Sequence, residues 1–255
     1  MDVAKQLYAI EEINAIFENK GFDFTFEQLL ESNDDDINWW INLSYDWKII
    51  IVYNHHRNST TSISKINNFD SIITTINSCK KIKLKNFLAE CKLMTIFHCS
   101  CYETYFIQDL KPIYYLVNLE RLYCQGLQVI NEQSISSLKN LTFIDFRGSN
   151  LDSLEMLAEI KGLEDLYIQR TEIKSLKGIE NLTFLKKINF SNTYVDSIEY
   201  LKNATKLEYL SCFQTYVYDL EPLRNLQELK TIFLYSTRIN NLDVFQQFKT
   251  LIALT

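Results

Sequence analysis

Histidines, cysteines and clustered carboxylates are the side chains with which this chain could coordinate a metal or transfer protons. His98, Cys99 and Cys101 fall in one predicted strand, where the two cysteines point to one face and His98 points to the other. Two thiols at that spacing suit neither a disulfide with each other nor a zinc motif. We therefore expect no metal site here.

The candidates for acid–base catalysis are equally sparse. The aspartates at 34–36 are typical of the charges that begin a helix, and His55 and His56 stand beside a polar loop, where histidines are usually solvated. No histidine follows His98, and the sequence contains no glycine-rich phosphate loop. We predict a protein that is not an enzyme, with no catalytic residues and no cofactor. One alternative is a catalytic N-terminal region, with the rest of the chain selecting the substrate.

The sequence supports the binding of another molecule better than it supports catalysis, and this support comes from a sequence repeat. Apolar residues recur every 22 residues from Phe97 to the end of the chain. One unit has Leu163, Leu166, Ile168, Thr171, Ile173, Leu176, Ile179 and Leu182, and the next has Leu185, Ile188, Phe190, Thr193, Val195, Ile198, Leu201 and Ala204. A period of this length is typical of a solenoid, in which each unit is a short strand plus a return segment.

The frame also sets the limits of the array. We predict regular repeats over 97–250, an atypical first repeat over 79–96 and a partial last strand at 251–255. Phe97, Tyr102, Tyr105 and Ile107 fit the first regular repeat. Two interpretations of the last strand stay open: it is itself the cap, or its edge pairs with a second copy in weak self-association.

Two further coincidences support the frame. Both prolines of the chain, Pro112 and Pro222, occupy the same repeat position, and Gly126 and Gly148 share a position just after the strand. Cys124 and Cys212 occupy core positions of their repeats, so we interpret them as small buried apolar residues.

Residues 1–78 do not follow the repeat of the array, and we predict that they form a mostly helical N-terminal cap. The segment 3–20 has apolar residues spaced for one face of a helix. Asp36 and Ser44 are candidate N-caps for helices over 37–43 and 45–53. Such a layer would cover the first strand of the solenoid, as solenoids require.

Composition narrows the partners and the compartment. The net charge of −6 and the isoelectric point of about 5.2 argue against nucleic acids and anionic membranes as partners. The N-terminus has no pattern of a secretion signal, and no apolar stretch approaches the ~20 residues of a membrane span. The six cysteines fit a reducing compartment. We therefore expect a cytoplasmic protein.

The repeating unit Leu-x-x-Leu-x-Leu-x-x-Thr-x-Ile-x-x-Leu-x-x-Leu-x-x-Leu resembles the leucine-rich repeat family, in the short 22-residue class of phosphatase regulators and bacterial internalin-like proteins. The resemblance implies an α/β solenoid: an arc with a parallel β-sheet on its concave side, 3₁₀ or irregular turns on its convex side, and partner binding as its usual activity. A Trp-rich segment at 38–48 resembles one that precedes such repeats in some bacterial proteins, so we expect a bacterial protein. The chain departs from the family's usual Asn at Thr171, Thr193, Thr215 and Thr237, with Ser149 at the same position. We expect these hydroxyls still to satisfy the turns, with fewer hydrogen bonds per repeat.

The strand residues that alternate with the core should face the concave side. Aromatic and arginine side chains, the types enriched at binding hot spots, are frequent among them. The predicted partner-binding residues are Arg121, Tyr123, Phe143, Arg147, Tyr167, Arg170, Tyr209, Phe213, Phe233 and Tyr235. The same positions also hold Asp145, Ser191 and Ser211. The alternative is that these rings merely stack on one another and stiffen the sheet.

These observations favour a module that binds a partner protein on its concave face, as an adaptor, an inhibitor or immunity protein, or an effector. A regulatory subunit of a phosphatase or another enzyme is the second hypothesis. The identity of the partner is not encoded in any motif of the sequence.

Overall fold

The computed structural model of the protein describes residues 35–44, 46–48, 50–51, 54, 88–101, 105–248 and 253–254. The chain divides into two compact units, Met1–Met94 and Thr95–Thr255. The predicted helix over 3–20 and most of the predicted cap lie outside the described residues and stay predictions. In the first unit, α3 spans Asp35–Ile41. The hydroxyl of Ser44 accepts a hydrogen bond from the backbone N–H of Trp47 at 3.3 Å, as an N-cap does.

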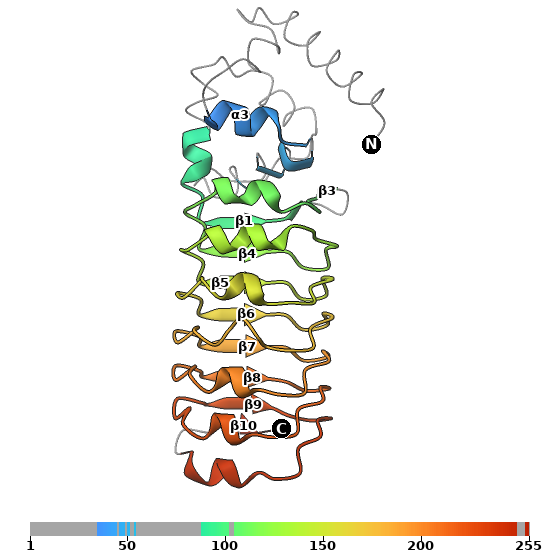
Figure 1. The fold of residues 1–255 in the computed structure, drawn as a ribbon, viewed down its shortest axis with the longest axis vertical. Helices are drawn as coiled ribbons and strands as arrows, with labels where there is room; N and C mark the ends of the chain where they lie inside the picture. The colour runs from blue at the N-terminus through green and yellow to red at the C-terminus, as the bar shows by residue number, and fades with distance from the viewer. Residues whose placement is uncertain are drawn as a thin grey trace, which may run out of the picture. The chain divides into compact units, whose positions relative to one another are not determined.

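A single parallel sheet forms one side of the second unit. Its described strands are β1 (Ile96–His98), β4 (Arg121–Tyr123), β5 (Phe143–Asp145), β6 (Asp165–Tyr167), β7 (Lys187–Asn189), β8 (Tyr209–Ser211), β9 (Thr231–Phe233) and β10 (Ala253–Leu254). They lie in chain order, each beside the strand of the next repeat (Figure 1). This arrangement confirms the predicted leucine-rich repeat solenoid. Self-association through β10 stays a prediction.

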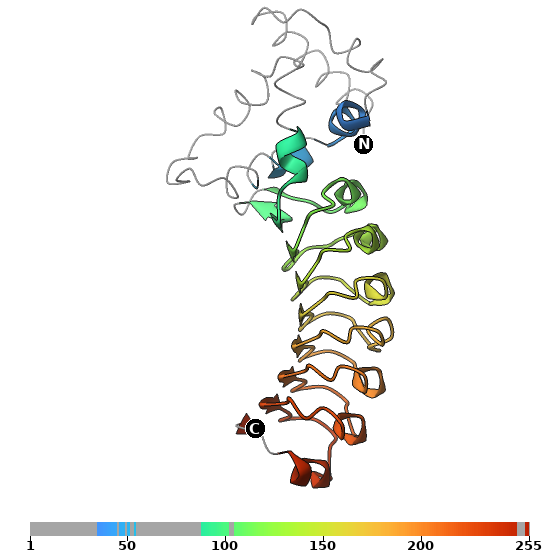
Figure 2. The same cartoon turned by 90° about the vertical axis from the view of Figure 1, so that its left-hand side faces the viewer.

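The return segments form the opposite side of the unit, where Figure 2 shows short helical turns stacked on one another. These 3₁₀ helices are η1 (Lys111–Tyr115), η2 (Glu132–Ser137), η3 (Glu155–Leu157), η4 (Glu199–Leu201), η5 (Glu221–Leu223) and η6 (Asp243–Gln247). Pro112 and Pro222 lie at the start of η1 and η5, where the fixed φ of proline suits a helical turn and its missing N–H has no cost. Between the two sides the leucines and isoleucines of the frame are buried from Leu119 to Ile232, as are Cys124 and Cys212, whereas Leu242 in the last repeat is 50% exposed.

The chain leaves each strand through one residue with a left-handed backbone. These residues are Gly126, Gly148, Arg170, Asn192, Gln214 and Ser236, with φ between 53° and 68°. In three of these repeats the next position holds a buried threonine, Thr171, Thr193 or Thr215, where leucine-rich repeats usually have asparagine. The hydroxyls of Thr171, Thr193 and Thr215 each donate to the carbonyl three residues earlier, at 2.7, 2.6 and 2.6 Å. These three threonines therefore close their turns, as expected, whereas the buried hydroxyl of Ser149 has no hydrogen-bond partner among the described residues.

The first regular repeat differs from the predicted frame. Phe97 was expected in register with Leu119, but it lies opposite Leu122, so the step to β4 is 25 residues. The additional residues lie between Cys99 and Ile107, where β2 (Ser100–Cys101) and β3 (Tyr105–Phe106) form an antiparallel pair. Tyr105 therefore belongs to a local excursion, and Tyr102 lies outside the described residues.

The excursion brings two cysteines together in the core. Cys99 and Cys124 are both buried, and the thiol of Cys124 lies 2.8 Å from the sulfur of Cys99. Burial raises the pKa of the Cys124 thiol well above its ordinary value. This contact was not expected from the sequence, because the correct register was needed to see it.

The described residues contain neither a candidate membrane span nor a candidate metal cluster. No described helix combines the length and apolar character needed to cross a membrane. Among the same residues, no three histidines, cysteines, aspartates or glutamates are grouped so as to hold a metal ion.

Candidate interaction surface

We define the concave face as the outward side of the sheet, formed by the strand residues that alternate with the core and by the turn residues that follow them. Figure 2 shows the second unit curving gently, with the strands on the inner side of the curve. The strands β4, β6 and β9 each bury their central residue and leave the two flanking residues partly exposed on this face. The sequence pattern predicted this alternation correctly.

Four rings form a continuous row across the first strands of the sheet, which we call the aromatic row. His98 stacks on Tyr123 with ring centroids 4.3 Å apart and an interplanar angle of 5°. Tyr123 contacts Phe143 at 4.9 Å, and Phe143 contacts Tyr167 at 5.5 Å, both in tilted arrangements. Such contacts are favourable beyond the area that they bury, and they fix the positions of the rings before any partner arrives.

Arg121 lies against this row. Its guanidinium carbon is 4.1 Å from the centroid of the Phe143 ring and 5.9 Å from that of Tyr123. Its Nε donates a hydrogen bond to the hydroxyl oxygen of Tyr123 at 3.1 Å. Stacking and hydrogen bonding together hold the guanidinium in one orientation, as expected for a cation over aromatic faces.

Arg147 is held by a buried carboxylate and not by aromatic rings. Asp145 is completely buried and accepts hydrogen bonds from Arg147 Nε at 2.9 and 3.0 Å and from its NH2 group at 2.5 Å. The backbone N–H of Arg147 and the amide of Gln125 also donate to this carboxylate. The hydrogen bond to Asp145 raises the pKa of the Arg147 guanidinium. Half of the Arg147 side chain remains exposed, so the pair presents a fixed guanidinium edge to solvent.

The middle of the concave face is more polar. Lys187 Nζ lies 3.6 Å from a carboxylate oxygen of Asp165 on the neighbouring strand. Ser191 and Ser211 share a hydrogen bond of 2.8 Å and are buried. Both serines occupy positions expected on the concave face, but the structure buries them.

A second aromatic group follows at the C-terminal strands, and we call it the aromatic pair group. Tyr209 contacts Phe233 at 5.8 Å, and Phe213 stacks on Tyr235 at 4.5 Å with an interplanar angle of 11°. Tyr235 is 49% exposed. The concave face therefore offers two aromatic areas separated by polar strands.

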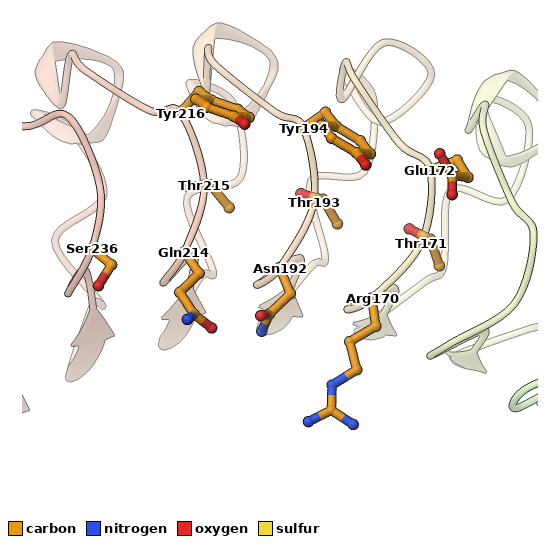
Figure 3. A pocket seen from close by; sticks show the side chains of 10 residues that line it. All are labelled: Arg170, Thr171, Glu172, Asn192, Thr193, Tyr194, Gln214, Thr215, Tyr216 and Ser236. Atoms are coloured by element: carbon orange, nitrogen blue, oxygen red, sulfur yellow. The ribbon is translucent and has the colours of Figure 1, made fainter.

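A rim groove of about 520 Å³ borders the concave face where the strands end (Figure 3). One side of the groove is lined by Arg170, Asn192 and Gln214. The other side is lined by Tyr194 and Tyr216, which come two residues after Asn192 and Gln214. Tyr194 and Tyr216 stack with centroids 6.4 Å apart, and the guanidinium of Arg238 lies 4.5 Å from the ring of Tyr216. The groove is open and polar, and it continues the surface around one edge of the sheet.

All ten predicted partner-binding residues lie in the described part of the chain, on the concave face or at its edge. Their exposure is uneven, since Phe143 is only 8% exposed whereas Arg147 and Arg170 are exposed. The prediction missed His98 as a member of the aromatic row. It also missed the burial of Asp145, which depends on cross-strand neighbours and leaves no mark on the local pattern.

The charge of the concave face is opposite to that of the whole protein. Its basic residues are Arg121, Arg147, Arg170 and Lys187, and its acidic residues are Asp145 and Asp165. Two of these cations are neutralised by the two aspartates. The chain as a whole has a net charge of −6. The concave face therefore carries a local cationic excess on an acidic protein.

No family model matches the sequence, and no curated protein matches it. Solved structures show clear likeness. The internalin C2 of Listeria monocytogenes has a TM-score of 0.57 and 21% identity, over 65% of this chain and 82% of that chain. The internalin inlF of the same species has a TM-score of 0.52 and 19% identity, over 58% of this chain and 50% of that chain. A leucine-rich repeat protein of Leptospira interrogans has a TM-score of 0.52 and 18% identity, over 56% and 39%. These comparisons establish the leucine-rich repeat fold, and they match only about half of the length of inlF.

Proposed function

We propose that this leucine-rich repeat protein is a non-enzymatic interaction module that binds a partner protein on its concave face. The observation that supports this most directly is the aromatic row with Arg121 and Arg147 fixed beside it. Tyrosines and arginines with restricted conformations lose little entropy on binding, which makes them effective contact residues.

The alternative, that the rings only stiffen the sheet, accounts for less of the structure. Stacking along strands explains the contacts among the four rings of the aromatic row. It does not explain why the guanidinium of Arg147 is oriented by a buried carboxylate yet left half exposed, since burying a charge has a considerable cost. An exposed, oriented guanidinium is useful when another molecule contacts it.

The concave face is also of suitable size. An ordinary protein–protein interface buries about 800 Å² on each partner, with a few central residues supplying most of the affinity. Strands β4–β9 supply six neighbouring repeats of contact residues. Solenoids characteristically use such a curved surface for binding. We infer that the aromatic row and the aromatic pair group are the two centres of the interface.

Affinity capture with quantitative mass spectrometry tests the proposal. The bait proteins are the wild type, a face variant with Tyr123→Ala, Tyr167→Ala and Phe213→Ala, and a control variant with Tyr114→Ala and Phe184→Ala. Tyr114 and Phe184 are 51% and 56% exposed and lie outside the sheet. Far-UV circular dichroism and thermal unfolding establish that all three proteins are folded.

We expect the wild type and the control variant to retain the same proteins from lysates of the source organism, and the face variant to lose them. Equal recovery by all three baits would show that binding, if it occurs, uses another surface. Loss in the control variant alone would assign binding to the surface around Tyr114 and Phe184.

A further inference from the structure

We propose that Arg121 receives a carboxylate side chain from the partner, so that the partner presents an acidic segment to the aromatic row. This inference rests on the proposed function, because it names the chemistry of the partner at the same face. Arg121 differs from Arg147 and Lys187, the two cations of the concave face that have an aspartate as ion-pair partner.

Arg121 is oriented without being neutralised. Arg147 and Lys187 each have an aspartate as an ion-pair partner. In the part of the chain that the structure describes, no carboxylate forms an ion pair with Arg121, whose contacts are the ring of Phe143 and the hydroxyl of Tyr123. A fixed guanidinium without a counter-charge, placed in the middle of contact residues, has its charge available to a visiting molecule.

The geometry favours a carboxylate. Only Nε of Arg121 is engaged by Tyr123, which leaves the two terminal nitrogens to donate in parallel to two oxygens of one carboxylate. The hydroxyl of Tyr123 accepts from Nε and retains its own proton, so it can donate to the same acceptor. Phe143 covers one face of the guanidinium, which directs a ligand to the edge of its plane.

The charge distribution supports the same partner chemistry. With Arg147 and Lys187 paired, Arg121 and Arg170 account for the cationic excess of the concave face. The chain has a net charge of −6, so an acidic segment would be repelled by the protein as a whole and attracted locally by the cations of the concave face. Such an arrangement contributes to specificity and orientation more than to affinity alone.

A peptide selection tests the inference without a known partner. A library of random dodecapeptides displayed on phage is selected in parallel on the wild type, on Arg121→Gln, on Arg121→Lys and on the face variant. Arg121→Gln keeps a hydrogen-bonding side chain without charge. Arg121→Lys keeps the charge without the planar fork. Thermal unfolding confirms that each protein is folded.

We expect peptides selected on the wild type to be enriched in Asp and Glu together with aromatic residues. This acidic enrichment should disappear on Arg121→Gln and be reduced on Arg121→Lys, while the aromatic enrichment persists on both. For the best acidic peptide, Arg121→Gln should weaken binding about tenfold or more, and it should have little effect on the same peptide with its acidic residue changed to the amide.

The two levels of the proposal fail in different ways. Selected peptides that are neutral or basic, or an acidic enrichment that survives in Arg121→Gln, would overturn the assignment of Arg121 while the proposed function stands. No selection on the wild type beyond that on the face variant would overturn the proposed function itself, and the role of Arg121 with it.

Discussion

Replacing Arg147 with alanine should destabilise the repeats more than replacing its partner Asp145. The asymmetry follows from where the two charges lie. Asp145 is completely buried, whereas 49% of the Arg147 side chain is exposed. Arg147→Ala leaves a buried carboxylate that retains only the amide of Gln125 and one backbone N–H. Asp145→Ala instead leaves a guanidinium that can turn into solvent.

The expected losses in the free energy of unfolding follow from this difference in burial. Removing one partner of a buried ion pair costs about 3 to 5 kcal/mol, and we expect about 3 kcal/mol for Arg147→Ala because water can enter where the exposed guanidinium stood. For Asp145→Ala we expect about 1 kcal/mol, the net loss of hydrogen bonds whose donors reach water. The double variant should resemble Asp145→Ala, since no buried charge remains to be compensated.

Urea unfolding followed by far-UV circular dichroism is the appropriate assay. Tryptophan fluorescence is unsuitable, because all three tryptophans, Trp39, Trp40 and Trp47, lie in the first unit. Lys230→Ala is the control, because its ion pair with Glu208 is exposed on both sides and should contribute less than about 1 kcal/mol. If Asp145→Ala proves as destabilising as Arg147→Ala, the reasoning from burial is wrong.

Three further predictions concern the stability of the repeats, each measured as the free energy of unfolding. Gly178→Ala should cost about 3 kcal/mol or more, since a Cβ there would lie 2.3 Å from the carbonyl oxygen of Leu154. Gly148→Ala should cost only about 1 kcal/mol, because no atom lies closer than 3.8 Å to the added Cβ and only the positive φ is unfavourable. Equal losses would refute this. Thr193→Val should cost about 1 to 2 kcal/mol, because it removes the hydroxyl that donates to the carbonyl of Phe190. Thr193→Ser keeps a hydroxyl and should retain most of the stability. A valine variant as stable as the wild type would contradict the turn-closing role. Burial raises the pKa of Cys212 from 9.0 to about 12, so its contribution to stability is complete below pH 9 and is lost as the pH rises towards 12. Between pH 9 and 10 the wild type should therefore lose about 1 kcal/mol more than Cys212→Ala, and parallel curves would exclude this linkage.

The sequence was sufficient to predict the array because core positions repeat at a fixed spacing. The alternation of buried and outward residues in β4, β6 and β9 follows directly from that spacing. It was insufficient at the first repeat, where Tyr105 fitted the frame by chance but lies in the additional β2–β3 pair. An apolar pattern reports which residues could be buried, and it is insensitive to a short excursion that returns to the same phase at Ile107.

The concave face of the sheet was predictable in position but not in detail. Every strand residue expected on the concave face occurs there, because the side-chain period of a strand is two. Burial within the face depends instead on the size of the neighbours across the sheet. Ser211 lies in register between Asn189 and Phe233 and is buried, and Asp145 is enclosed by Arg147 and Gln125. The contacts with Gln125, Asn189 and Phe233 join residues 20 to 22 positions apart, and the sequence of a single repeat does not reveal them.

The constant register from β4 to β9 also bears on how the protein could diversify. Each strand pairs with the next residue for residue at a separation of 22. A gene that lost or duplicated one such unit would encode a chain whose hydrogen bonds still close on both sides of the join. The aromatic row and the aromatic pair group would then move apart or together by one strand spacing, about 4.8 Å. Gain or loss of whole repeats would therefore adjust the distance between the aromatic row and the aromatic pair group to a changed partner while the scaffold stays intact.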